Sequence, residues 1–409
     1  MASSGEPTYI PADVQEGQRR VLFINSPTSI GADTAIHFLL LKYLPREALE
    51  VHAAGQPSRF GEGPSPAFEA LQAMPELALK STYFGPSLYG LGRTEKLARA
   101  LRLVPAAASL VDLARYVRAH RIQILHATDR PRDAVACAAL ARVTGAKAVI
   151  HVHVKYDNWM SRGVKWALGR ADRLVGVSEF VAESLRNAGY PRERIVAIPN
   201  AIEIERWDPS LSPAPGRQSL GVAQGTPLIV SVARLFYWKG HKELIEALAL
   251  VKRDEPGVRL CIVGADYPEG SGVTQSLREL ARGLGIEEDV LFVGQRSDIP
   301  ALLAACDVFA LPSFEEPFGL VFAEAMAMKR PVAALSNGGT PEVVEHERSG
   351  LLSAPGDVPG LARNLLRLVR DPQLRARMGE EGRARVEARF GAPRLAQDFV
   401  DLYAQLAEA

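Results

Sequence analysis

Short β-branched and aliphatic runs alternate with helical stretches along most of the chain, in two successive series. This alternation is typical of an α/β fold with a parallel sheet. The predicted strands are at 21–26, 49–53, 122–126, 148–152, 173–177 and 194–198, and then at 228–233, 259–263, 290–293, 308–311, 331–334 and 350–352. A single hydrophobic core stops growing near roughly 250–300 residues. A chain of 409 residues is therefore expected to form two doubly wound domains.

Breaks in the pattern predict the domain boundaries. The first twenty residues are polar and predict a mobile tail, before a first domain over 21–206. Residues 207–226 carry four Pro or Gly in their first ten positions and predict a linker to a second domain over 227–385. A helix over 386–409 is expected to pack back on the first domain. Ligands are expected in a cleft, outside the carboxyl ends of the strands.

The charge balance excludes one class of partner. Lys and Arg number 48, Asp and Glu number 47, and the formal net charge is +1. A nucleic-acid-binding protein would usually show a strong basic excess. No nucleic-acid partner is therefore expected, and the charge gives no indication of the oligomeric state.

The cysteines and the apolar runs bear on the compartment. Cys137, Cys261 and Cys306 are far apart and show neither a disulfide framework nor metal-ligand spacing. The first residues lack the apolar core of a secretory signal, and no apolar run approaches the ~20 residues of a membrane-spanning helix. We expect a cytoplasmic protein, at most peripheral at the inner face of the membrane.

The most informative segment runs from Leu311 to Lys329. A hydrophobic strand leads to a loop with Glu316, and Gly319 opens a helix that carries Glu324. Free N–H groups at the helix start favour an anion, and Gly319 lets a phosphate approach the backbone closely. Glu324 lies in an otherwise apolar helix, where an unpaired carboxylate is costly to bury, so a ribose diol is a suitable partner. The alternative is that both glutamates are solvated charges.

A second motif follows the first strand of the second domain. Arg234 and Lys239 lie there, in the stretch SVARLFYWKG (231–240). Arg binds phosphate oxygens bidentately and Lys acts as a mobile point charge, so the pair would neutralise a leaving diphosphate without a metal. The chain has no Asp-x-Asp motif and no Cys–His cluster, and we expect neither a metal site nor a cofactor. Taken singly, the Arg and the Lys could equally be ordinary surface residues.

These motifs resemble the retaining glycosyltransferases of family 4, which have the GT-B fold of two Rossmann-like domains. The matching stretches are ADRLVGVSEFVAESL (171–185), RIVAIPNAIE (194–203), SVARLFYWKG (231–240), RLCIVGAD (259–266), VLFVGQRSDIP (290–300), EEPFGLVFAEAMA (315–327) and SNGGTPEVVEHERSGLL (336–352). The resemblance implies transfer of a hexosyl group from a nucleotide diphosphate sugar, UDP- or GDP-linked, to a hydroxyl of a glycan, lipid-linked saccharide or small molecule. It also implies retention of configuration.

The resemblance also implies a role for each matching residue. Arg234 and Lys239 would bind the donor diphosphate, Glu324 the ribose and Glu316 the transferred sugar. The remaining donor-binding candidates are Gly31, Gly264, Arg296, Phe318, Gly319, Leu320 and Val321. Among these, Arg296 is expected near the base, and 318–321 near phosphate and sugar hydroxyls through their backbone amides.

The first domain matches the family less closely. The family's Gly-Gly loop after the first strand is SIGAD (29–33) here, with only Gly31. His153, near the end of a strand, matches the histidine that similar enzymes place against the donor sugar. His126, Asp129, Tyr156 and Trp159 are candidates for acceptor contacts. A strand histidine or an aromatic cluster is equally typical of core packing.

Two rival functions remain open at this point. A nucleotide-sugar epimerase would need acid–base carboxylates in the first domain, and none can be identified. A non-catalytic nucleotide-sugar-binding subunit would keep the fold without turnover. Separately, Arg93, Lys96, Arg99 and Arg102 line a Leu- and Ala-rich segment. This segment fits a solvated amphipathic helix better than weak association with an anionic membrane surface.

Overall fold

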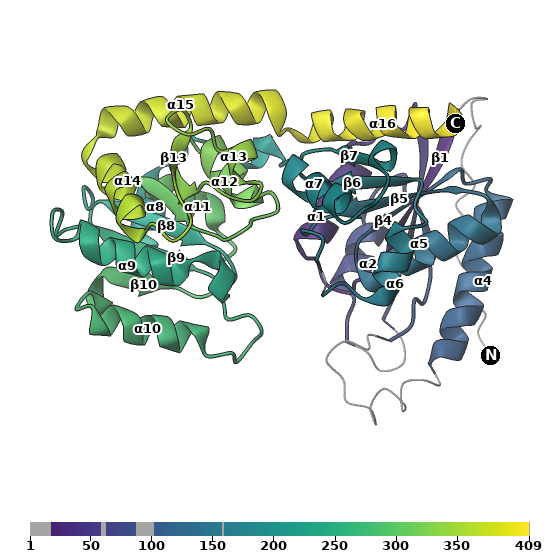
Figure 1. Cartoon of the computed structure of the whole chain (residues 1–409), viewed down its shortest axis with the longest axis horizontal. Helices are drawn as coiled ribbons and strands as arrows, with labels where there is room; N and C mark the ends of the chain where they lie inside the picture. The colour runs from purple at the N-terminus through teal and green to yellow at the C-terminus, as the bar shows by residue number, and fades with distance from the viewer. Residues whose placement is uncertain (1–17, 59–62, 87–101, 158, 409) are drawn as a thin grey trace. The chain divides into compact units, whose positions relative to one another are not determined.

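The computed structural model describes residues 18–58, 63–86, 102–157 and 159–408 (Figure 1). The chain divides into two compact units. Unit 1 consists of Met1–Val177, Val181–Ile198 and Leu395–Ala409, and unit 2 of Ser178–Phe180 and Pro199–Arg394. Most of the expected tail and the basic positions 93, 96 and 99 lie outside the described residues.

Unit 1 is built on a parallel sheet with the strand order β3-β2-β1-β4-β5-β6-β7. The strands are β1 (Arg19–Asn25), β2 (Leu49–Gly55), β3 (Ala78–Ser81), β4 (Ile124–Thr128), β5 (Lys147–Val152), β6 (Arg173–Gly176) and β7 (Ile195–Ala197). The helices are α1 (Ala32–Tyr43), α2 (Pro66–Gln72), α4 (Leu103–Ala119), α5 (Pro131–Thr144), α6 (Arg162–Leu168), α7 (Glu179–Asn187) and α16 (Ala392–Glu408). Helices cover both faces, which explains why a central strand such as β1 is a continuous apolar run.

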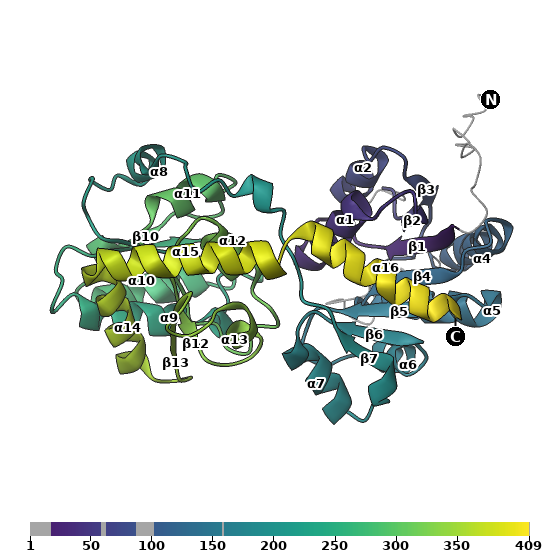
Figure 2. The ribbon, with the colours of Figure 1, turned by 90° about the horizontal axis from the view of Figure 1, so that it is seen from above.

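Unit 2 repeats this architecture with the strand order β10-β9-β8-β11-β12-β13. Its strands are β8 (Leu228–Val232), β9 (Arg259–Val263), β10 (Val290–Phe292), β11 (Val308–Leu311), β12 (Val332–Leu335) and β13 (Gly350–Ser353). Its helices are α8 (Pro213–Leu220), α9 (His241–Val251), α10 (Val273–Gly283), α11 (Ile299–Ala305), α12 (Leu320–Ala327), α13 (Thr340–Val343), α14 (Val358–Arg370) and α15 (Pro372–Arg389). Helices α9 and α14 pack together over the sheet, and α15 crosses α12 (Figure 2).

Each sheet has one point at which the strand order reverses. In unit 1 this point lies between β1 and β4, and in unit 2 between β8 and β11. Open α/β sheets bind ligands outside the carboxyl ends of their strands at such a switch point. The loops that follow β8 and β11 are those that carry Arg234, Lys239 and Glu316. The topology therefore brings the two sequence motifs of unit 2 to one edge.

The range 207–226, expected to be a linker, belongs to unit 2 and contains α8. Ser212 caps this helix and Gly221, in the left-handed conformation, ends it. Its prolines and glycines are thus helix start and stop signals. Arg217 is buried and donates to the carbonyls of Ala223 and Thr226, which fixes the segment to the domain.

At the N-terminal end the described chain differs from the expected tail, whereas the last helix packs on unit 1 as expected. Arg19 and Arg20, inside the expected tail, begin β1. At the other end, α16 covers the sheet of unit 1, where the Tyr403 hydroxyl is hydrogen-bonded to Nδ1 of His126. Within the described residues, no helix is both long and apolar enough to span a membrane.

Candidate active site

The two loops at the switch point of unit 2 meet through Lys239 and Glu316. Lys239 ends the 3₁₀ helix η3 (Tyr237–Lys239), and its Nζ lies 2.6 Å from Oε2 of Glu316. Ser313 Oγ donates to the same carboxylate oxygen over 2.7 Å. Both charged side chains are only partly exposed, at 22% and 12%. A cation and an anion are thus fixed side by side at the edge where a ligand of a parallel sheet binds.

Two glycines hold the backbone of the Glu316 loop. The amide of Gly339 donates to the Glu316 carbonyl over 2.7 Å. Gly338 has φ +59°, and a Cβ there would lie 2.7 Å from both the N and the O of Glu316. Glu315 itself adopts a left-handed φ of +47°. The adjacent glycines of SNGGTPE (336–342), a stretch expected to shape the loops around the site, thus permit a close backbone approach to Glu316.

Arg234 lies on the loop after β8 and is stacked on an aromatic ring. Its guanidinium carbon is 4.2 Å from the ring centroid of Tyr267, and the side chain is exposed. Gly264, at φ +149°, lies so close to the carbonyl of Ala233 that a Cβ would be 1.9 Å from it. Gly264 therefore lets the loops after β8 and β9 pass each other, which positions Arg234.

The start of α12 is open to an anion. Gly319 precedes the helix at φ +87°, and no side chain caps it. Phe318 is buried and packs edge-on against Phe390, while Leu320 and Val321 are half-buried. First-turn amides without a side-chain cap, together with the helix dipole, favour a phosphate.

Glu324 lies one turn into α12, in a largely desolvated position. Burial raises the pKa of its carboxyl to about 7, although the charge of Arg206 acts to lower it. Such a carboxyl is about half ionised near neutral pH. It is suited to accept hydrogen bonds from a diol that would replace the lost water.

This pKa predicts a pH-dependent effect of Glu324→Gln. The folded-state pKa of about 7 lies above the unfolded value of 4.5, so the folded protein binds more protons between these two pH values. The free energy of unfolding therefore falls as the pH rises through this window. Removing the carboxylate should stabilise the protein by up to roughly 2–3 kcal/mol at pH 8 and have little effect at pH 4.5.

Urea unfolding of wild type and Glu324→Gln at both pH values measures this difference. Glu269→Gln, at an exposed position, is the matched control and should change little at either pH. An equal change for Glu324→Gln at both pH values would contradict the pKa assignment.

Arg296, expected near the base, has other partners in unit 2. Its guanidinium forms two hydrogen bonds with Asp298, with N–O distances of 2.8 and 2.6 Å, and a third with Ser219 of α8 at 3.3 Å. The structure therefore places this side chain against its own loop and α8. A contact with a base would require it to leave the Asp298 carboxylate.

In unit 1, Gly31 lies at the start of α1, beside an ion pair. Nη2 of Arg130 donates to Oδ1 of Asp33 over 2.8 Å, and a Cβ on Gly31 would be 2.9 Å from that nitrogen. Burial opposes ionisation of Asp33, but the hydrogen bond and charge of Arg130 outweigh it and lower its pKa to about 2. The loop after β1 is thus tied to the loop after β4 by a charged pair, which the sequence analysis did not identify.

His153 and Asp129 lie at the carboxyl edge of the same sheet. Burial lowers the pKa of His153 to about 4. Burial, together with the charge of Asp33, raises the pKa of Asp129 to about 7. The structure therefore presents a neutral imidazole and a carboxyl poised near neutrality after neighbouring strands.

The other acceptor candidates are placed differently. His126 is fully buried beneath α16 and hydrogen-bonded to Tyr403, so its position is that of a core residue and not of a contact to an acceptor. Its strand position did not reveal this, because the covering helix comes from the far end of the chain. Tyr156 is half-buried against Tyr190, and Trp159 is 63% exposed.

Comparison with known proteins places this architecture in a family. The model of the glycosyl transferases group 1 matches residues 215–385, and the model of glycosyltransferase family 4 matches residues 40–206. The chain is 32% identical over 270 residues to a GDP-mannose-dependent monoacylated alpha-(1-6)-phosphatidylinositol monomannoside mannosyltransferase of Corynebacterium glutamicum. This match covers 62% of the chain and 69% of the relative. The chain belongs to the group 1 glycosyltransferases.

Two further similar proteins extend the comparison. A D-inositol 3-phosphate glycosyltransferase of Saccharomonospora viridis is 33% identical over 59% of the chain, and the chain spans 57% of its length. The solved structure of Anabaena Alr3699/HepE in complex with UDP has a TM-score of 0.77 and 26% identity. That comparison covers 94% of the chain and all of the neighbour. The fold of this group 1 protein is accordingly GT-B.

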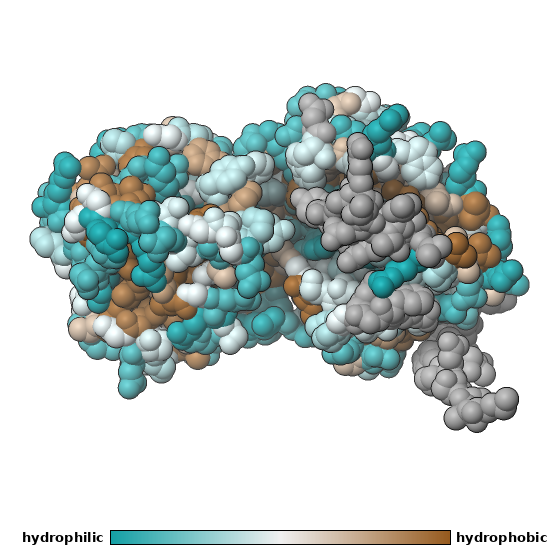
Figure 3. All heavy atoms as spheres, turned by 90° about the horizontal axis from the view of Figure 1, so that it is seen from below, coloured by the Kyte–Doolittle hydropathy of each residue, from teal (hydrophilic) through white to brown (hydrophobic). Residues whose placement is uncertain are grey.

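A large hollow of about 910 Å³ flanks the candidate site in unit 2. Its lining combines apolar side chains with polar and charged ones, and Tyr237 is 68% and Trp238 49% exposed. The apolar members are Phe236, Tyr237, Trp238, Val273, Leu277, Leu280 and Phe314, and the polar or charged members are His241, Lys242, Glu243, Ser271, Ser276, Glu315 and Asn337. Hydrophobic side chains gather on the face of unit 2 that carries α10 (Figure 3).

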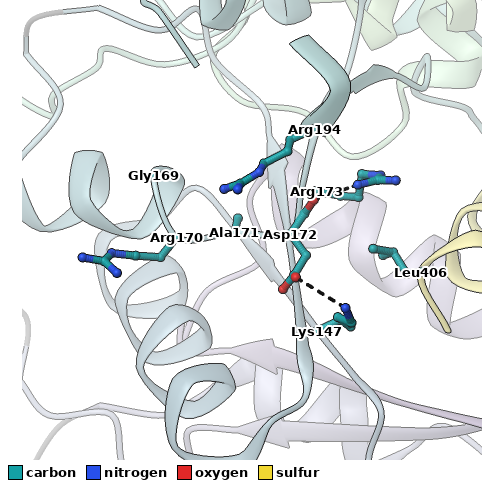
Figure 4. Close-up of a pocket in the computed structure, with 8 residues that line it drawn as sticks. All are labelled: Lys147, Gly169, Arg170, Ala171, Asp172, Arg173, Arg194 and Leu406. Atoms are coloured by element: carbon teal, nitrogen blue, oxygen red, sulfur yellow. Dashed lines mark hydrogen bonds and ion pairs between the residues drawn. The ribbon is translucent and has the colours of Figure 1, made fainter. Parts of the chain in front are cut away.

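A second cavity, of about 490 Å³, lies in unit 1 at the amino ends of strands β5, β6 and β7 (Figure 4). Lys147 and Arg173 begin β5 and β6 there, and Arg194 lies just before β7. Asp172 faces Lys147, with 3.9 Å between its Oδ1 and Nζ. Ligands of parallel sheets bind at the carboxyl ends, so this cavity lies at the edge of unit 1 where no ligand of the sheet is expected.

Proposed function

We propose that this group 1 protein is a retaining, metal-independent glycosyltransferase. It transfers a hexosyl group from a nucleotide diphosphate sugar to a hydroxyl acceptor. The observation that carries the proposal is the arrangement at the switch point of unit 2. Lys239, Glu316 and Ser313 are in direct contact there, on the loops that follow β8 and β11.

The donor diphosphate is assigned to the cations and amides of this edge. Lys239 and Arg234 supply positive charge, and the uncapped start of α12 supplies N–H groups. When the bond to the sugar breaks, negative charge develops on the diphosphate. Cations and N–H groups that are already fixed at that place stabilise this charge without reorganisation.

The two glutamates are assigned to the ribose and to the hexose of the donor. Glu324, with its raised pKa, accepts hydrogen bonds from the ribose diol. Glu316 orients the hexose through its second carboxylate oxygen, because Oε2 is occupied by Lys239 and Ser313. In unit 1 we assign His153 to the sugar and Asp129 to the acceptor hydroxyl. The leaving phosphate oxygen takes the acceptor proton, so no protein nucleophile is required.

A uridine nucleotide is the first choice for the donor. The Anabaena neighbour, at 26% identity, was solved with UDP, whereas the Corynebacterium relative is named for GDP-mannose. The location of the side chains that could bind a metal ion supports metal independence. Within the described residues, both groups of side chains that could hold a metal ion belong to unit 1, and neither includes a residue of the loops after β8 and β11.

A donor panel tests the proposal. Purified protein is incubated with UDP-, GDP-, ADP- and TDP-sugars without added divalent cations, and free nucleoside diphosphate is followed with and without candidate acceptors. We expect one donor to be consumed at a rate that added Mg²⁺ or Mn²⁺ leaves unchanged. Glu324→Ala should lose this activity, while Glu269→Ala should keep it.

The rival function predicts a different result. A non-catalytic binding subunit would bind one nucleotide sugar by calorimetry and release no nucleoside diphosphate with any acceptor. A rate that rises from zero only on addition of Mg²⁺ would contradict metal independence and leave the transferase assignment intact.

A further inference from the structure

Three histidines from three elements of unit 1 converge in its interior. His37 of α1, His126 of β4 and His151 of β5 are each 0% exposed. One ring nitrogen of each lies within 4.8 Å of the corresponding nitrogens of the other two. The ring centroids are 4.7 Å apart for His37 and His126, 5.7 Å for His126 and His151, and 6.0 Å for His37 and His151. Phe23 and Phe399 pack against this cluster and close it from the side.

The ring nitrogens of this cluster lack hydrogen-bond partners. Both nitrogens of His37, both of His151 and Nε2 of His126 are buried without a partner among the described residues. A buried polar atom left unpaired costs stability and calls for an explanation. Nδ1 of His126 is held by the Tyr403 hydroxyl, which fixes this ring and leaves Nε2 available. Support of a ligand's second nitrogen in this way is typical of metal-bound histidines.

The spacing of the rings matches a common metal ion. Three imidazoles bound to one tetrahedral zinc at about 2.1 Å place their ring centroids about 5 Å apart and their ligating nitrogens about 3.4 Å apart. The observed centroid distances of 4.7–6.0 Å bracket the first value. The nitrogens need to approach by about 1 Å, which small side-chain rotations provide.

A second group in unit 1 provides a contrast. Glu50, His52 and His120 also offer ligand atoms within 4.8 Å of one another. There, however, Nδ1 of His52 is hydrogen-bonded to the Tyr116 hydroxyl at 2.8 Å, and Nε2 to Glu50 at 3.0 Å. That group is satisfied by its protein partners and needs no ion.

We propose that His37, His126 and His151 bind a divalent transition-metal ion of the zinc type, which ties α1 to β4 and β5. An all-imidazole donor set suits zinc and its neighbours, whereas Mg²⁺ and Ca²⁺ prefer oxygen ligands. All three ligands belong to unit 1, and the role of the ion is to stabilise that unit.

Metal content tests the site without any use of transferase activity. Untagged wild-type protein, stripped of metal and reloaded with Zn²⁺, should retain about one zinc per chain after gel filtration. Zn²⁺ should also raise its melting temperature by several degrees. Replacement of Zn²⁺ by Co²⁺ in the wild-type protein should give the visible absorption of a low-coordinate cobalt site. This measurement requires no variant.

Variants locate the ion. His37→Gln and His151→Gln should each lower zinc affinity at least tenfold and lose the zinc-dependent rise in melting temperature. His52→Gln, in the satisfied group, should keep both. The proposal is overturned if wild type retains no stoichiometric zinc and shows no cobalt spectrum. It is also overturned if zinc is lost only in His52→Gln, because the ion would then be bound by the group of Glu50, His52 and His120.

Discussion

Lys239→Ala is expected to lower kcat/KM by about 10²–10³-fold, the loss typical of removing one preorganised charge from a developing anion. The lysine Nζ lies 2.6 Å from Glu316, so its removal also leaves that carboxylate beside Ser313 alone. The effect should fall mainly on kcat, since the charge on the diphosphate grows as the bond to the sugar breaks. Initial rates over a range of donor concentrations separate the two parameters.

Lys242→Ala is the matched control for this variant. Lys242 lies three residues further along, is 66% exposed and approaches only the Glu246 carboxylate, at 3.8 Å, in the described ion pairs. It should keep wild-type rates within about twofold. The double variant Lys239→Ala/Glu316→Gln should lose less than the product of the two single effects, because residues in contact act as a unit. Full additivity would show that the two side chains act independently in the reaction.

Gly338→Ala is expected to lower kcat/KM by about 10²-fold, although residue 338 makes no charge contribution. A Cβ at this position would lie 2.7 Å from the Glu316 backbone N and O, so the Glu316 loop must move. Displacement of a positioning residue by about 1 Å costs rate on this scale. Steady-state kinetics of the purified variant, with the nucleotide sugar that the donor panel identifies, measure the loss.

Gly356→Ala separates this clash from backbone strain. Gly356 has φ +79° and Gly338 φ +59°, so both substitutions force an alanine into the left-handed region, at about 1 kcal/mol. At Gly356, however, a Cβ meets nothing within 4 Å. Gly356→Ala should therefore lose stability but keep its activity. Equal activity losses in the two variants would show that strain, and not the position of Glu316, is responsible.

Much of the donor-side arrangement follows from local sequence. A strand, a turn and a helix start are local features, and each carries its charged residues at fixed offsets. Arg234, Lys239, Glu316 and Glu324 therefore fall at the carboxyl edge of unit 2 wherever the strands are placed correctly. The two-domain α/β architecture is confirmed for the same reason, since the alternation of strands and helices is repeated in both halves.

The features of the structure that could not be predicted from the sequence depend mostly on contacts between residues far apart in the chain. The burial of His126 depends on Tyr403, 277 residues away, and on the docking of α16. The pair of Asp33 and Arg130 joins residues 97 apart. The short strand β3 escaped prediction because its four residues include Lys80 and Ser81 and show little apolar character. Prolines and glycines at 207–226 signalled a break, and only packing against α11 shows that the segment is a helix of the domain.

The most direct test of the central claim follows the anomeric centre of the transferred sugar. The wild-type protein is incubated with the α-linked nucleotide sugar that it consumes and with its acceptor, and the product's anomeric proton is observed by NMR while nucleoside diphosphate appears. The account predicts an α-linked glycoside formed in step with one nucleoside diphosphate, without added divalent metal. A β-linked product, or binding of the donor with no glycoside formed, would contradict it.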